Sequence, residues 1–414
     1  MKDILLQNIS NPTELERLYQ ENKLAFKHAF QDLPSSIKEQ PLAQAWNARL
    51  SYSPKDTIFQ YKPEIIFIAV CTAIAGMLAK IPDLFGWEND LFYQRNAGLI
   101  VIPVLAAYFL WKQKLKINHW ITPFILFGIA ALYINFLPVN TKSDTLLLAC
   151  LHLPFFLWSI WGFTSLGENT NNQLLRIEFL KFNGNLAIMS GLLLITGFVF
   201  TAMTFGLFNL IGLNIELFYT KFALVWGIPA IPIVATYLVK NNPNLVNRIS
   251  PLIAKIFTPL VLITLISFLL AMVINQKNPY NDREFLILFN AMLIAVIAII
   301  LFSTTESSQS SSHRINRILL FALSIVSIVV NAIALSAIVF RLTEYGITPN
   351  RMAVLISNLL IFTNLIMVSA RLFKAIKNEN AMEEVNLSIA KFLPLYSLWT
   401  AIVVFAFPVL FGFK

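Results

Sequence analysis

Residues 317–340 read RILLFALSIVSIVVNAIALSAIVF, an apolar run whose one charged residue, Arg317, stands at its start. The hydrocarbon core of a bilayer is roughly 30 Å thick, and an α-helix needs about 20 apolar residues to cross it. Helices suit this role because they pair their backbone N–H and C=O groups within the segment, where lipid offers no partner. The run therefore predicts a transmembrane helix.

The same pattern recurs along most of the chain. Of the 414 residues, 57% are hydrophobic and 13% are charged, whereas soluble proteins carry about 25% charged residues. Similar runs predict eleven spans, near residues 64–80, 97–111, 120–137, 145–164, 186–209, 219–239, 253–275, 285–303, 317–340, 351–370 and 393–412. The predicted fold class is all-α, a polytopic transmembrane helical bundle formed by residues 63–414, with the lipid bilayer as its first partner.

Residues 1–62, called the head below, are predicted to form a short amphipathic helical segment in the cytoplasm. A helix start is visible in Asn11 as N-cap, Pro12 at the first position and Glu14 at the third. Apolar residues then recur at helical spacing, namely Leu15, Leu18, Tyr19, Phe26, Ala29, Phe30 and Leu33, and a second helix carries Leu42, Trp46 and Leu50. So short a pair buries little surface alone. We expect it to dock on cytoplasmic loops or the bilayer surface, or alternatively to bind a membrane-protein partner.

Charge predicts the orientation, because cytoplasmic loops keep an excess of Lys and Arg. With the N-terminus inside, 22 of the 31 basic residues fall in the head and in alternate loops on that side. This places the head in the cytoplasm and Lys414 outside. Basic residues spread over membrane-flanking loops do not indicate a nucleic-acid partner. The first apolar run begins near Glu64, so the first membrane helix is expected to act as the targeting signal.

The sequence contains no known catalytic signature. It lacks the phosphate-binding GxxxxGK[ST] loop, the GxSxG elbow, the HExxH pair and the GxGxxG fingerprint. Its two cysteines, Cys71 and Cys150, lie in apolar runs without CxxC spacing. No metal and no cofactor are expected, and catalytic residues stay unknown.

Polar residues inside the predicted spans are few. His152 is the one titratable group predicted to lie away from a helix end. It is either hydrogen-bonded to a neighbouring helix or part of a functional relay, since a charge costs at least ~2.5 kcal/mol at that depth. Asn331, Asn358 and Asn364 either join helices through hydrogen bonds or act as ligands.

A helix break is predicted at Gly227, Pro229 and Pro232 in the sixth span. Backbone groups freed by proline are tolerated at membrane depth against protein or a wet cavity. Transporters hold substrates with such broken helices. The motif predicts either a simple kink or part of a cavity.

The turn 341–351 carries two arginines on the side that otherwise excludes them. Gly346 suits a left-handed position, and Thr348 and Pro349 supply an N-cap and a first helical position. Arg341, Glu344 and Arg351 then form either an anion or lipid-headgroup site, which would suit a lipid-linked phosphate, or a tight turn with membrane-anchoring arginines.

Several stretches resemble an uncharacterised family of bacterial multi-pass membrane proteins, the domain-of-unknown-function 4153 group. They are Arg283 to Leu286 with Asn290, residues 331–338, residues 341–351 and residues 407–414. The resemblance implies a bacterial inner-membrane protein and indicates nothing about substrate.

Together these patterns favour a non-enzymatic inner-membrane protein that transports or binds a hydrophobic or anionic envelope-related molecule. Two alternatives stay open. A membrane glycosyl or phosphoryl transferase acting on a lipid-linked substrate would use carboxylates of the first outside loop, which holds Asp83, Glu88 and Asp90. A scaffold of an envelope complex would act through its head and co-purify with a partner.

Overall fold

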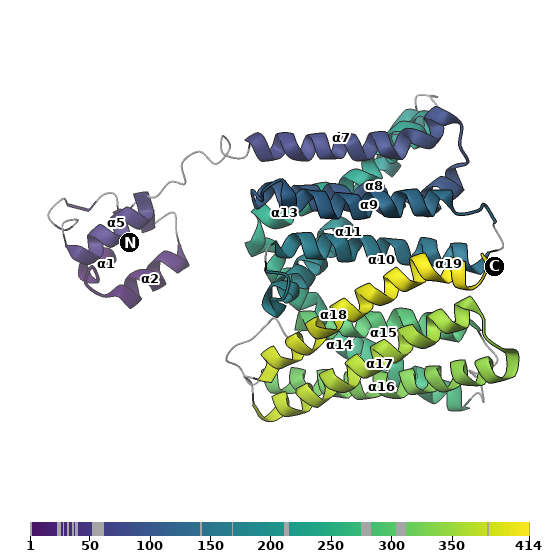
Figure 1. Ribbon diagram of the computed structural model, residues 1–414. Helices are drawn as coiled ribbons and strands as arrows, with labels where there is room; N and C mark the ends of the chain where they lie inside the picture. Colours follow the sequence, from purple (N-terminus) through teal and green to yellow (C-terminus); the bar gives the residue numbers. More distant parts are fainter. Residues whose placement is uncertain are drawn as a thin grey trace. The chain divides into compact units, whose positions relative to one another are not determined.

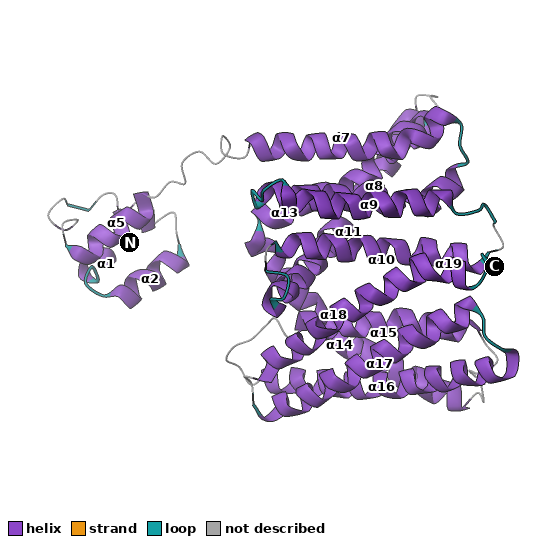
Figure 2. Cartoon of the chain, viewed as in Figure 1, coloured by secondary structure: helices purple, strands orange, loops and turns teal. Residues whose placement is uncertain are grey.

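The computed structural model describes residues 2–22, 26–27, 29–30, 33–34, 37, 40–51, 62–140, 143–167, 169–210, 215–274, 283–303, 312–378 and 381–413. The chain forms two compact units, Met1–Ile66 and Phe67–Lys414. All regular structure in the described residues is helical, and no strand occurs among them (Figure 2).

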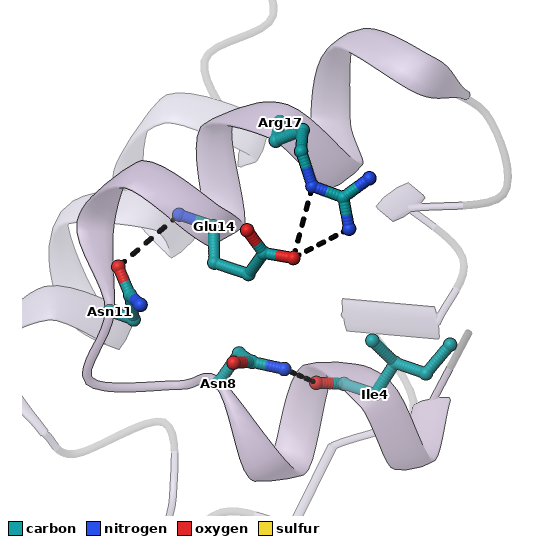
Figure 3. A network of polar contacts seen from close by, with 5 residues as sticks. All are labelled: Ile4, Asn8, Asn11, Glu14 and Arg17. Atoms are coloured by element: carbon teal, nitrogen blue, oxygen red, sulfur yellow. Dashed lines mark hydrogen bonds and ion pairs between the residues drawn. The ribbon is translucent and has the colours of Figure 1, made fainter.

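The first unit holds three described helices, α1 (Lys2–Gln7), α2 (Pro12–Glu21) and α5 (Pro41–Ser51). The predicted start of α2 is confirmed, because Asn11 Oδ1 accepts a hydrogen bond from the Glu14 amide and Pro12 is the first helical residue. Figure 3 shows how Arg17 then donates to the Glu14 carboxylate, one turn along the helix. This hydrogen bond lowers the pKa of the Glu14 carboxyl.

The apolar residues of this unit bury one another. They form a core of Leu5, Ile9, Leu15, Leu18, Phe26, Phe30, Leu33, Ala43 and Trp46. The Trp46 ring lies 5.0 Å from that of Phe26 and 5.3 Å from that of Tyr19. The head thus forms an apolar core to which α1, absent from the sequence prediction, contributes Leu5. Docking of the head on the loops or on the bilayer stays a prediction.

The second unit consists of long helices and a few short helical segments. They are α7 (Lys62–Phe85), α8 (Asn89–Lys112), α9 (Asn118–Phe136), α10 (Asp144–Leu166), α11 (Gln173–Leu210), α12 (Glu216–Phe218), η1 (Tyr219–Leu224), α13 (Val225–Asn241), α14 (Pro243–Ile274), α15 (Arg283–Ser303), α16 (Ser312–Tyr345), α17 (Pro349–Lys377), α18 (Met382–Ala401), η3 (Ile402–Ala406) and α19 (Phe407–Leu410). Figure 1 shows them packed side by side with roughly parallel axes. Each predicted span falls, to within a few residues, on one helix or on a continuous helical series.

Eight helices among the described residues are long and apolar enough to cross a membrane. Shorter apolar helices occur at Ile256–Leu270 and Met292–Ser303, within α14 and α15. Helix α8 is neither among the eight long apolar helices nor among the shorter ones, because its first half carries polar residues such as Gln94, Arg95 and Asn96. The chain is thus an all-α multi-pass membrane protein.

Helix α11 begins before the predicted span at 186–209 and runs for 38 residues. In its first turns Phe179 lies 5.2 Å from the Trp161 ring and 5.4 Å from the Trp158 ring, both on α10. Aromatic packing therefore holds the start of α11 against α10.

Buried side chains of this unit form two large apolar clusters. The first cluster comes mainly from α7 to α11 and α13, and the second from α14 to α18. Gly184 of α11 and Phe302 of α15 meet between them. A Cβ atom added at Gly184 would lie 1.8 Å from Phe302 Cζ, so the ring occupies the space that a side chain would need.

Candidate functional site

A crevice of about 380 Å³ lies between the ends of α8 and α10, the first half of α9 and the last turns of α18. Small-molecule sites typically enclose roughly 300 to 1,000 Å³. The crevice is lined by Leu110, Leu115, Asn118, His119, Thr122, Pro123, Leu126, Phe156, Ser159, Ile160, Phe163, Thr164, Gly167, Thr170 and Ser397.

The lining changes from polar to apolar along the helices. Asn118 and His119 open α9 at the mouth, and Thr170 follows the end of α10. Leu126 lies eight residues into α9, about 12 Å from its start at 1.5 Å per residue. Phe156 lies ten residues before the last residue of α10, about 15 Å inward. The lining is therefore mostly polar at the helix ends and mostly apolar farther in, where the hydroxyls of Ser159 and Ser397 donate to carbonyls of their own helices.

The loop between α8 and α9 is fixed against the end of α10. Gln113 Nε2 donates a hydrogen bond of 3.0 Å to the Ser165 carbonyl. Gly167 closes α10 with φ +59°, a conformation in which glycine meets no steric penalty. Leu115 packs beside Gly167 and contributes its side chain to the crevice wall.

Basic residues occur in the segments that flank the crevice. Lys112, Lys114 and Lys116 alternate along the loop and are all exposed. On the other side, Arg176 of α11 donates through Nη2 to the Thr170 carbonyl at 2.8 Å. A smaller adjoining cavity, lined by Arg176, shares Ser159, Phe163 and Ser397 with the crevice.

No protein-family model, curated protein or solved structure matches this chain. Its own geometry is therefore the basis for assigning a function.

His152 and the three asparagines lie outside the lining of the two described cavities. His152 Nδ1 is 2.9 Å from the Leu148 carbonyl of its own helix. Asn331 Nδ2 donates to the Asn358 carbonyl at 3.2 Å and joins α16 to α17, while Asn364 Nδ2 donates to Tyr396 Oη at 3.1 Å and joins α17 to α18. All three asparagines are fully buried, and these bonds connect helices.

The helix continues through the predicted break. Pro229 and Pro232 lie inside α13, and the irregularity is the π-helical segment η1 directly before it. Proline has no N–H to donate to the residue four positions earlier, so Pro229 and Pro232 leave the carbonyls of Val225 and Ile228 without that helical donor. Gly227, Pro229 and Pro232 line neither of the two described cavities.

The turn after α16 has the predicted caps. Gly346 takes φ +75°, and Thr348 Oγ1 accepts a hydrogen bond from the Arg351 amide. Arg351 Nη1 donates to the carbonyls of Tyr345 and Gly346 at 2.8 and 2.7 Å. Its guanidinium thus provides hydrogen-bond donors for two carbonyls at the end of α16.

The three residues of the predicted anion site are not joined to one another. No ion pair between Arg341 and Glu344 occurs in the part of the chain that the structure describes. Arg341 Nη1 is buried without a hydrogen-bond partner, and Glu344 is exposed.

Sequence reasoning missed Arg95, which it placed in the first outside loop. Arg95 is the seventh residue of α8 and is 5% exposed. It donates to the carbonyls of Asn135 and Leu137 at 3.0 and 2.9 Å, at the end of α9. Arg95 is therefore an ionisable residue buried among the helices, and the predicted spans did not include it. The apolar residues 91–93 before Arg95 were the available signal that the helix starts earlier.

Metal ligands do not gather within the described ranges. No group of three His, Cys, Asp or Glu side chains there could hold an ion. Cys71 and Cys150 are both buried and free.

Arg351 provides a test that separates capping from anion binding. Arg351→Ala should destabilise the protein by about 1.5 kcal/mol, because it leaves two carbonyls without a charged donor. Arg351→Lys should retain most of this stability, since one ammonium group carries three donors. Thermal unfolding in detergent measures both. Loss of retained anionic lipid in the lysine variant, with stability unchanged, would instead support the anion site.

Proposed function

We propose that this protein binds an amphiphile in the crevice between α9, α10 and α18, as a step in transporting or presenting a hydrophobic or anionic envelope-related molecule. The observation that carries the proposal is the change from a mostly polar lining at the helix ends to a mostly apolar lining farther in, within one cavity of a membrane protein. An amphiphile presents the same change along its length.

The crevice walls also allow lateral entry. Leu126 is 38% exposed and Phe163 is 45% exposed, on helices that cross the membrane. Such surfaces face acyl chains in a bilayer, so a lipid tail can reach the interior without crossing water.

The remaining alternatives have less support. Asp83, a carboxylate proposed for a transferase, forms an ion pair with Lys80, and no described contact favours a scaffold. The bacterial inner membrane is proposed as the location from the family resemblance. The cytoplasmic head and external C-terminus are proposed from the distribution of basic residues.

Filling the crevice tests the proposal. Ser397→Phe puts a ring into the cavity that Ser397 lines and should displace two or more methylenes of a bound chain. At about 0.8 kcal/mol per buried methylene, retained lipid should fall about tenfold. Mass spectrometry of lipid per folded protein after mild detergent purification measures the change.

The matched control is Ser336→Phe, because Ser336 is an exposed serine of α16 outside the crevice. Its ring should face lipid and leave retention unchanged. Ser159→Leu, on α10, is the second variant if Ser397→Phe does not fold. Equal retention in wild type, crevice variant and control would overturn the proposal.

A further inference from the structure

We infer that the amphiphile carries an anionic headgroup, a phosphate or carboxylate, held at the crevice mouth by the loop from Lys112 to His119. This inference rests on the proposed function and names the ligand class that the mouth selects.

The loop that carries these lysines adjoins the crevice. Leu115 lines the crevice, and Lys114 and Lys116 are its exposed neighbours in sequence. Gln113 Nε2 donates a hydrogen bond to the Ser165 carbonyl and so connects the loop to the end of α10. Asn118 and His119 continue the lining directly after the lysines. The amide of Asn118 and the imidazole of His119 therefore belong to the crevice wall, and the two ammonium groups are carried by the segment that leads into it.

Lys114 has an unusual backbone conformation. Its φ is +53°, in the left-handed region that glycine and asparagine adopt most readily. This conformation closes α8, because the Lys114 amide donates to the Trp111 carbonyl and the Leu115 amide donates to the Leu110 carbonyl. The turn directs the chain from α8 to Leu115 at the crevice wall.

Charge around the mouth favours an anion. No described residue that lines the crevice is a carboxylate. In sequence, the segments 112–119 and 166–178 together contain three lysines and one arginine against Glu168 and Glu178. A purely cationic headgroup would meet net repulsion there, whereas phosphate or carboxylate accepts hydrogen bonds from ammonium, imidazole and amide groups.

The test compares two lipids with the same acyl chains, phosphatidylglycerol and phosphatidylcholine, added to the full-length protein in mild detergent. The wild type should retain more phosphatidylglycerol. The double variant Lys114→Gly/Lys116→Gln should lower that preference at least fivefold, since each lysine near an anionic lipid contributes about fivefold. Glycine at position 114 suits the left-handed backbone, so this variant should remain folded.

The matched control is Lys374→Gln/Lys377→Gln, which removes two exposed lysines at the end of α17. It should leave the preference unchanged. An equal loss in the control would overturn the inference, because general surface attraction would then explain binding. Equal retention of both lipids by the wild type, with Ser397→Phe still lowering both, would overturn the inference but leave the proposed function standing.

Inorganic phosphate distinguishes the source of the anion. Displacement of phosphatidylglycerol by millimolar phosphate would show that the loop recognises the phosphate group itself. Undisturbed phosphatidylglycerol, combined with the loss in the lysine variant, would show that the loop recognises a headgroup held by its acyl chains. Both results support an anion site at the mouth.

Discussion

Gly184→Ala is expected to destabilise the bundle by about 2 to 3 kcal/mol, the usual cost of adding a group to filled space. The Phe302 ring lies where the new methyl group would go, with three ring carbons within 2.6 Å of it. The ring or the α11 backbone has to move, at the contact between the two apolar clusters. Chemical unfolding in detergent, followed by tryptophan fluorescence, measures the loss.

Two further variants isolate this contact. Gly191→Ala lies on the same helix with no atom within 4 Å of the added carbon, and should stabilise by up to about 1 kcal/mol through helix propensity. In a Phe302→Leu background, Gly184→Ala should lose most of its cost. If Gly184→Ala destabilised equally in both backgrounds, the ring contact would not be the cause.

Arg95→Leu is expected to cost about 3 kcal/mol or more. The arginine is buried, and its guanidinium donates to the carbonyls of Asn135, Leu137 and Pro138 at the end of α9. Removing it leaves these acceptors without a charged donor in a dry environment, and each such buried group costs about 1 to 3 kcal/mol. The positive charge also offsets the negative end of the α9 dipole. The midpoint of thermal unfolding should fall accordingly.

Arg371→Leu is the comparison for this prediction. Arg371 forms an ion pair with Glu384, and both side chains are well exposed. Exposed pairs contribute about 0 to 1 kcal/mol, so this variant should unfold close to the wild-type temperature. If Arg95→Leu and Arg371→Leu lowered the unfolding temperature by similar amounts, the burial of Arg95 would not contribute to the stability of the protein.

The helices could be predicted from sequence because their signals are local. An apolar run is contained within one helix, and the cap at Thr348 needs only residues 346–351. Arg95 was misplaced because its partners are backbone carbonyls some forty residues later, which no side-chain pattern reveals. The contribution of α1 to the core of the head was not predicted. The helical spacing of apolar residues was followed only from Leu15 onward, whereas the core also includes Leu5 of α1.

The crevice could not be predicted for a stronger reason. Its lining joins Leu110, Thr164 and Ser397, which are far apart in sequence and look like ordinary membrane-helix residues. Only the packing of α8, α10 and α18 brings them together. The alternation of lysines before His119 was the one local sign of a mouth, and it also fits the usual basic flank of a membrane helix.

Helix α11 is longer than a helix needs to be to cross the hydrocarbon core of a bilayer. Its 38 residues extend about 57 Å, and even a tilt of about 40° leaves some 44 Å along the membrane normal, about 14 Å more than the hydrocarbon thickness. Arg176, Glu178 and Lys181 mark the first turns as the part that projects. These turns pack on α10 through Phe179, and Arg176 and Phe179 form part of the wall of the smaller cavity that adjoins the crevice. The excess length of α11 therefore supplies a wall to this cavity as well as a membrane crossing.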